Sequence, residues 1–195
     1  MRGKLVATLL VPALILTACS DVADSTDDIE FAADALEERL DAIKLAVGQW
    51  QDAETIEVAH GAAETAANLI VGPGGPGYGD RDGDGVVDGA AKAGVLPGLD
   101  GTPSGLAEPL SANQCLDNDV LGGSWADPSA RWDEMTAAID DWRPDDNTMP
   151  TLASHPMRVV GWATFTSASS SLQEAHEYAG QAALHVRISS DALDC

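Results

Sequence analysis

Apolar residues recur at steps of three and four along two segments in the first half of the chain. In residues 27–47 and again in residues 52–71 this spacing places one apolar stripe along a helix. The first stripe consists of Ile29, Ala32, Leu36, Leu40, Ile43 and Val47, and the second of Ile56, Ala59, Ala63, Ala66 and Ile70. Gly48 is a stop signal, and residues 49–51 form a short connection, which predicts an antiparallel helical hairpin.

Helical patterns return in the second half of the chain. Asp127 followed by Pro128 is typical of a helix start, and a third stripe consists of Trp132, Met135, Ile139 and Trp142 before Pro144. A last helical region covers residues 156–188, with Ser154 or His155 near its start. The serine-rich residues 167–171 either break this region in two or let a neighbouring helix approach closely.

Residues 72–123 separate the two halves and are rich in glycine and proline, which predicts a long irregular loop. No segment shows a strand pattern of convincing length. We therefore predict an all-α fold, with a single four-helix-bundle-like domain in residues 27–195 and the long loop between its second and third helices.

The N-terminus has the organisation of an export signal. Arg2 and Lys4 precede an apolar run from Leu5 to Leu16, which is shorter than the roughly 20 residues of a membrane-spanning helix. The following residues, Leu16-Thr17-Ala18-Cys19, resemble the lipobox of bacterial lipoproteins. That resemblance implies that residues 1–18 are removed as a signal peptide and that Cys19 is acylated. Residues 19–26 would then be a tether, and the protein would lie outside the cytoplasm, anchored to the cell membrane or the outer membrane.

The charge balance limits the partners of the domain. The chain has 32 acidic and 10 basic residues and a formal net charge of −22. Such a surface repels nucleic acid and anionic lipid headgroups, so we expect no nucleic-acid partner and membrane contact only through the lipid on Cys19. An envelope protein partner is compatible with the sequence, which does not identify it. The acidity fits a cation-binding protein, a saline habitat or simply a soluble surface.

Two of the three cysteines are left once Cys19 is assigned to the lipid. An even pair in an oxidising compartment predicts a disulfide between Cys115 and Cys195. The alternative is a pair of free thiols.

The strongest internal motif is Asp80-Arg81-Asp82-Gly83-Asp84-Gly85-Val86-Val87-Asp88, which resembles the first nine positions of an EF-hand calcium loop. A tight turn with this spacing aims alternate carboxylates at one point, and Gly85 permits the sharp bend. The resemblance implies Ca²⁺ ligands from the side chains of Asp80, Asp82, Asp84 and Asp88 and from the carbonyl of Val86. Val87 is expected to point into the core.

The motif departs from the family at position 12, where a bidentate glutamate is replaced by Ala91. Asp100 or Glu108 is a candidate source of the missing oxygens, and hard oxygen ligands favour Ca²⁺. An incomplete extracellular loop suggests a dissociation constant of roughly 10⁻⁴–10⁻³ M. The alternative is a solvated turn without a metal.

A second resemblance covers the helix that leads into the loop. The segment from Asn68 through Gly72 to Gly85, with Gly94-Val95-Leu96 and residues 174–179, is similar to parts of uncharacterised secreted helical proteins of bacteria. The histidines that those proteins carry before the loop are absent here. The similarity supports the helical architecture and implies no activity.

Histidines offer a different kind of site. A haem-type or transition-metal centre in the bundle would need His60 to meet His176 or His185 across helices, with Met135 or Met157 as further candidates. His176 and His185 cannot share a metal within one helix, because nine residues place them on nearly opposite faces. No nucleophile motif appears, so we do not expect an enzyme. The leading hypothesis is a lipid-anchored calcium-binding helical protein with a structural or binding role, and the alternative is a redox or metal-binding bundle.

Overall fold

The computed structural model describes residues 24–143, 149 and 151–195, and within this part of the chain it contains helices and no strand. The signal peptide, Cys19 and residues 19–23 of the expected tether lie outside the described residues. The main helices are α1 (Asp24–Gln51), α2 (Ile56–Val71), α3 (Pro128–Asp141), α4 (His155–Ala168) and α5 (Leu172–Asp191). The expected all-α fold is confirmed.

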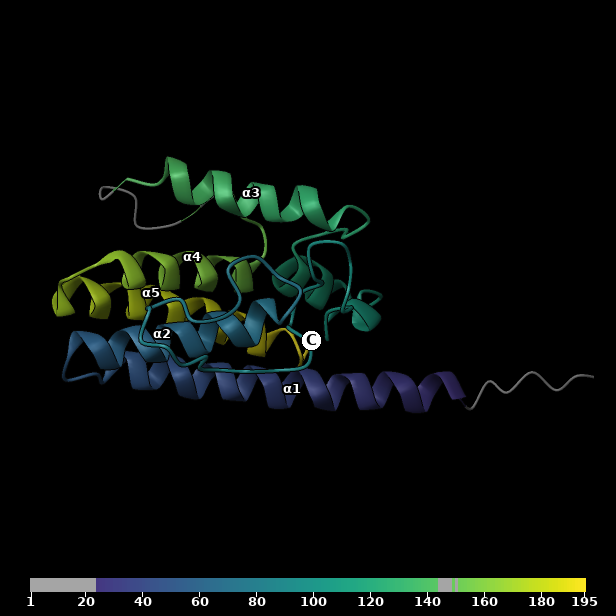
Figure 1. Cartoon of the computed structure of the whole chain (residues 1–195). Coiled ribbons are helices and arrows are strands. Elements are labelled where there is room, and N and C mark those ends of the chain that lie inside the picture. The colour runs from purple at the N-terminus through teal and green to yellow at the C-terminus, as the bar shows by residue number, and fades with distance from the viewer. Residues whose placement is uncertain (1–23, 144–148, 150) are drawn as a thin grey trace, which may run out of the picture.

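Four of these helices form the bundle. Helix α1 packs against α2 and α5, α2 packs against α4, and α4 packs against α5, while α3 lies along the outer side of α4 (Figure 1). The helix expected as the third member of the bundle is therefore an outer helix, and the last helical region supplies two members. It is broken at residues 169–171, where the Ser171 hydroxyl accepts a hydrogen bond from the Glu174 N–H and starts α5.

The turn between α1 and α2 lies further along the chain than expected. Helix α1 continues through Gly48 to Gln51, because Trp50 is completely buried and its packing outweighs the roughly 1 kcal/mol helix cost of a glycine. The connection is then residues 52–55, and the Thr55 side chain caps α2 by accepting from the Val58 N–H. At its other end α1 begins at Asp24, so part of the expected tether is helical.

The predicted stripes form the core with one exception. Leu36, Leu40, Ile43 and Val47 of α1 are buried, whereas Ile29, one turn before the packed region, is 53% exposed. The buried face of α2 is mostly alanine. Small side chains let other segments approach this helix closely, and the long loop is one of them.

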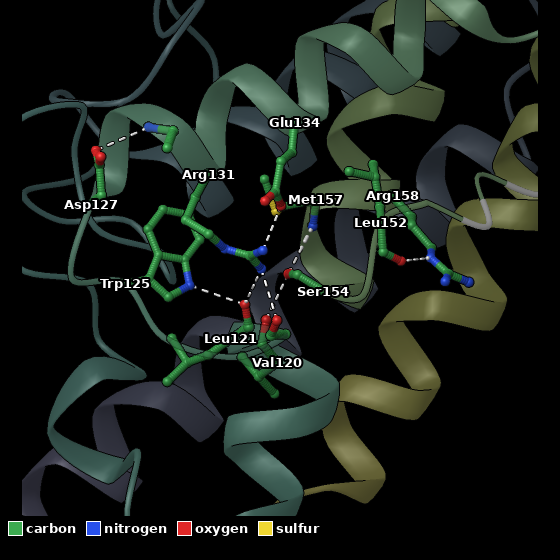
Figure 2. A network of polar contacts seen from close by, with 12 residues as sticks. Val120, Leu121, Trp125, Asp127, Arg131, Glu134, Leu152, Ser154, Met157 and Arg158 are labelled. Carbon is green, nitrogen blue, oxygen red and sulfur yellow. Dashed lines mark hydrogen bonds and ion pairs between the residues drawn. The ribbon is translucent and has the colours of Figure 1, made fainter.

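The segment before α3 contains two short helices, η1 (Glu108–Leu110) and the π-helix η2 (Leu116–Leu121). The carbonyls of the last two residues of η2, Val120 and Leu121, accept hydrogen bonds from side chains (Figure 2). The Ser154 hydroxyl donates to Val120 O at 2.6 Å, the Trp125 indole N–H donates to Leu121 O at 2.9 Å, and Arg131 donates to the Leu121 carbonyl as well. These contacts join η2 to the starts of α3 and α4.

The disulfide between Cys115 and Cys195 is present, with a Cα–Cα distance of 6.2 Å and a sequence separation of 80. It ties the last residue to the start of η2. Within the described ranges, no helix is both long and apolar enough to cross a lipid bilayer.

Candidate metal centre

The acidic loop is fastened to α2 by one buried carboxylate. Glu64 is 1% exposed and lies beneath residues 81–88. Its Oε2 accepts from the N–H groups of Arg81 and Asp82, and its Oε1 accepts from the Asp88 N–H at 2.8 Å. Three loop amides therefore converge on one side chain, which fixes where the loop begins and ends relative to the helix.

Asn68, one turn further along α2, completes this attachment. Its side-chain amide donates to the carbonyls of Gly79 at 2.9 Å and Asp88 at 2.7 Å, and its Oδ1 accepts from the Gly79 N–H at 3.1 Å. Asn68 also donates a longer 3.4 Å bond to Glu64 Oε1. The two side chains form a polar strip on an otherwise apolar helix face.

Arg81 supplies a cation beside the buried carboxylate. Its guanidinium donates to Pro76 O at 3.1 Å and to Asn68 Oδ1 at 3.4 Å. Burial lowers the pKa of Arg81 to about 10, and the nearby charge of Glu64 opposes that decrease. The arginine stays protonated at neutral pH and partly compensates the negative charge beneath the loop.

The exposed part of the loop turns around its own aspartates. Asp80 accepts from the N–H groups of Gly83 and Gly85 through its two oxygens, at 2.7 and 2.9 Å. Asp82 accepts from the Asp84 N–H, and Asp84 accepts from the Val86 N–H. Each of these oxygens keeps lone-pair capacity for a further ligand.

Two glycines let the loop lie directly on α2. A Cβ on Gly61 would lie 3.2 Å from Asp88 Oδ2 and 3.9 Å from Asp82 Oδ2, so these two carboxylates sit against the helix backbone. A Cβ on Gly89, whose φ is +71°, would come within 2.5 Å of Thr65 O. The side chains of the second half of the loop thereby reach the same helix face as Glu64.

The result is a cluster that could hold a metal ion. The cluster consists of Glu64, Asp80 and Asp82, whose carboxylate oxygens lie within 4.8 Å of one another. Among the described residues, it is the group of three side chains able to bind a metal that meets this distance limit. Two of its members were predicted from the calcium-loop resemblance. The triad does not include the other predicted side-chain ligands of the same turn, Asp84 and Asp88. The Val86 carbonyl stays a predicted ligand.

Two details differ from the expectations for this loop. The third carboxylate comes from Glu64 on the preceding helix, not from Asp100, which accepts from the Thr102 N–H, or from Glu108, which starts η1. The expectation that Val87 points into the core is wrong, because its side chain is 43% exposed. The loop is held on α2 by polar contacts instead, which the buried side chains of Glu64 and Asn68 make with the Asp88 backbone.

The histidines lie elsewhere and have defined partners. His60 Nε2 lies 3.0 Å from Ser169 O, and His176 Nε2 lies 2.8 Å from Ala53 O. His185 is paired with His155, not with His60, and their Nδ1 atoms are 2.8 Å apart. The sequence predicts His155 only near the start of a helix.

Comparison with known proteins found no family model, no curated protein and no solved structure that matches this chain.

Replacement of Glu64 by glutamine should loosen the loop even without a metal. The glutamine amide would place donor hydrogens against N–H groups that now donate to a carboxylate, and we expect a loss of about 2–4 kcal/mol in the free energy of unfolding. Urea denaturation in EDTA measures this loss, and hydrogen exchange of the Arg81 and Asp88 amides locates it. Glu37→Gln, the same change at an exposed position of α1, is the control and should alter the free energy of unfolding by no more than about 0.5 kcal/mol. Equal effects of the two changes would contradict the role of Glu64.

The His155–His185 pair should make stability depend on pH. Burial lowers the pKa of His185 to about 4, with His155 and Arg158 adding to the decrease. Burial and Arg158 also lower the pKa of His155, against the opposing charge of Asp119. Because both pKa values lie below the ordinary 6.5, the unfolded chain takes up protons first. The free energy of unfolding should therefore fall as the pH decreases from about 6.5 to 4.

The histidine contribution should amount to about 2 kcal/mol after allowance for solvent screening. Urea denaturation at several pH values measures this contribution as the difference in the free energy of unfolding between wild type and the double variant His155→Gln with His185→Gln. The many carboxylates titrate alike in the two proteins, so their effect cancels in the difference. Parallel pH profiles of the two proteins would show that the pair contributes nothing.

Proposed function

We propose that this protein is an extracytoplasmic lipoprotein whose acidic loop binds Ca²⁺, and that the ion serves a structural or binding role in the helical domain. The observation that carries the proposal is the Glu64–Asp80–Asp82 cluster beneath a glycine-rich loop docked on α2. A redox role for the histidines has no comparable observation behind it.

The chemistry of the donors favours calcium over other metals. Every candidate ligand is an oxygen, which suits hard cations such as Ca²⁺ and not zinc or copper. Four aspartates within nine residues repel one another, and a cation would offset that repulsion. Glycines at positive φ, Gly83 and Gly85, make the turn possible but raise the entropic cost of ordering it.

The hydrogen bonds of Glu64 suggest how the ligands divide their roles. Both Glu64 oxygens accept loop N–H groups, so this side chain mainly positions the loop and adds negative charge next to the ion. Direct coordination then belongs to Asp80, Asp82 and the remaining turn residues Asp84, Val86 and Asp88. In this proposal Glu64 supplies, from the helix, the negative charge but not the coordination of the glutamate that the loop lacks where Ala91 stands.

Calcium should stabilise the domain by mass action, by about 2.7 kcal/mol when its concentration is 100-fold above the dissociation constant. For a weak site, several millimolar Ca²⁺ should raise the melting temperature by a few degrees, and Mg²⁺ should raise it much less. Differential scanning calorimetry with and without 10 mM Ca²⁺ (on the order of ten times the upper dissociation constant) measures the difference.

The double variant Asp82→Asn with Asp84→Asn should abolish this response. Asparagine keeps the side-chain acceptor for the turn hydrogen bonds and removes the charge. Asp140→Asn with Asp141→Asn removes the same charge from exposed positions on α3 and is the matched control. The calcium proposal fails if the wild-type transition is identical with and without the ion, or if both double variants respond equally.

The proposed location rests on the lipobox-like residues 16–19 and is supported by the disulfide, since such bonds persist mainly in oxidising compartments. Replacement of Cys19 by alanine should abolish acylation and leave the precursor uncut. Mass spectrometry of the protein from its native membrane fraction is the test. A mature N-terminus other than an acylated Cys19 would exclude the proposed anchor.

A further inference from the structure

An open groove runs beside the loop and has a volume of about 1270 Å³. One wall is the second half of α1 with the connection to α2, and another is the first half of α2. The aspartates of the turn close the groove on the side of the loop. The groove thus lies next to the metal cluster and shares Asp82 with it.

Two large apolar side chains lie open in this groove. Leu45 of α1 is 66% exposed and Val58 of α2 is 52% exposed. A single exposed leucine is ordinary, but these two come from different helices and line the same groove. They offer a contact for apolar side chains of a partner.

Most of the charged side chains that line the groove are acidic. The helical walls contribute Asp41, Asp52, Glu54 and Glu57, and the loop contributes Asp82, Asp84 and Asp88. Lys44 is the basic side chain among the lining residues. A groove lined by one sign of charge concentrates the electrostatic potential and selects ligands of the opposite sign.

We propose that this groove is the docking site for a basic amphipathic segment of a partner protein. Lysine or arginine side chains of the segment would pair with the acidic rim, while its apolar side chains would cover Leu45 and Val58. Nucleic acids and anionic headgroups carry the wrong charge for this surface. A bare metal ion would leave Leu45 and Val58 uncovered.

Fluorescence anisotropy with a labelled amphipathic lysine–leucine peptide tests the proposal. The full chain is used in neutral detergent with EDTA, so the outcome does not depend on calcium binding. A scrambled peptide of the same composition reports charge attraction alone. We expect the amphipathic peptide to bind at least tenfold more tightly than the scrambled one, and photo-crosslinks to fall on residues 41–65.

Variants separate docking in the groove from attraction to the whole acidic surface. Leu45→Ser with Val58→Ser removes the two exposed apolar side chains, and Asp41→Lys with Glu54→Lys reverses the charge of part of the acidic lining. Each pair should weaken binding about tenfold or more. The matched control Asp133→Lys with Asp140→Lys makes the same charge change on α3 and should alter binding less than twofold.

Three results would overturn the proposal. These are equal binding of the two peptides, an equal effect of the rim and control variants, and unchanged binding after loss of Leu45 and Val58. Self-association of the protein that is abolished by the Leu45→Ser and Val58→Ser changes would assign the groove to a second copy of the chain instead.

Discussion

The arrangement of the loop depends on a single buried carboxylate. Placing Glu64 under the loop removes a charge from water, which is costly unless the charge is fully hydrogen-bonded. The N–H groups of Arg81, Asp82 and Asp88 meet that requirement, and the Arg81 guanidinium offsets part of the charge. The dependence is mutual, because the loop satisfies the glutamate and the glutamate holds the loop. The metal cluster and one side of the acidic groove both follow from this contact.

Helical periodicity is sufficient to predict the all-α class, because α1, α2 and α3 each bury residues of a recognisable apolar stripe. It failed at boundaries where tertiary packing opposes a local signal. Gly48 is a reasonable stop for a helix, yet the burial of Trp50 carries α1 one turn further. The assignment of helices to the bundle was also incomplete. The pattern of α3 is as strongly amphipathic as that of a bundle helix, and only the fold shows that its apolar face covers α4 from outside.

The candidate site was predictable only as far as it is local in sequence. Asp80 and Asp82 belong to one motif, and their proximity follows from its spacing. Glu64 lies before the loop and was missed, although a glutamate and an asparagine four residues apart on an alanine-rich helix are a detectable signal of a buried polar contact. The error at Val87 has the same origin, since the loop is held by polar side chains of α2, which lie outside the motif. The pairing of His155 with His185 joins different helices, and no spacing rule predicts it.

The disulfide between Cys115 and Cys195 has a consequence for the integrity of the chain. It closes a covalent ring that contains α3, α4, α5 and everything between them. A protease that cuts this ring once opens it without releasing a fragment, because both new ends remain joined through the sulfur bridge. Two of the four bundle helices are thereby retained after a single cut, and the nicked molecule keeps its parts at the high effective concentration that favours reassembly.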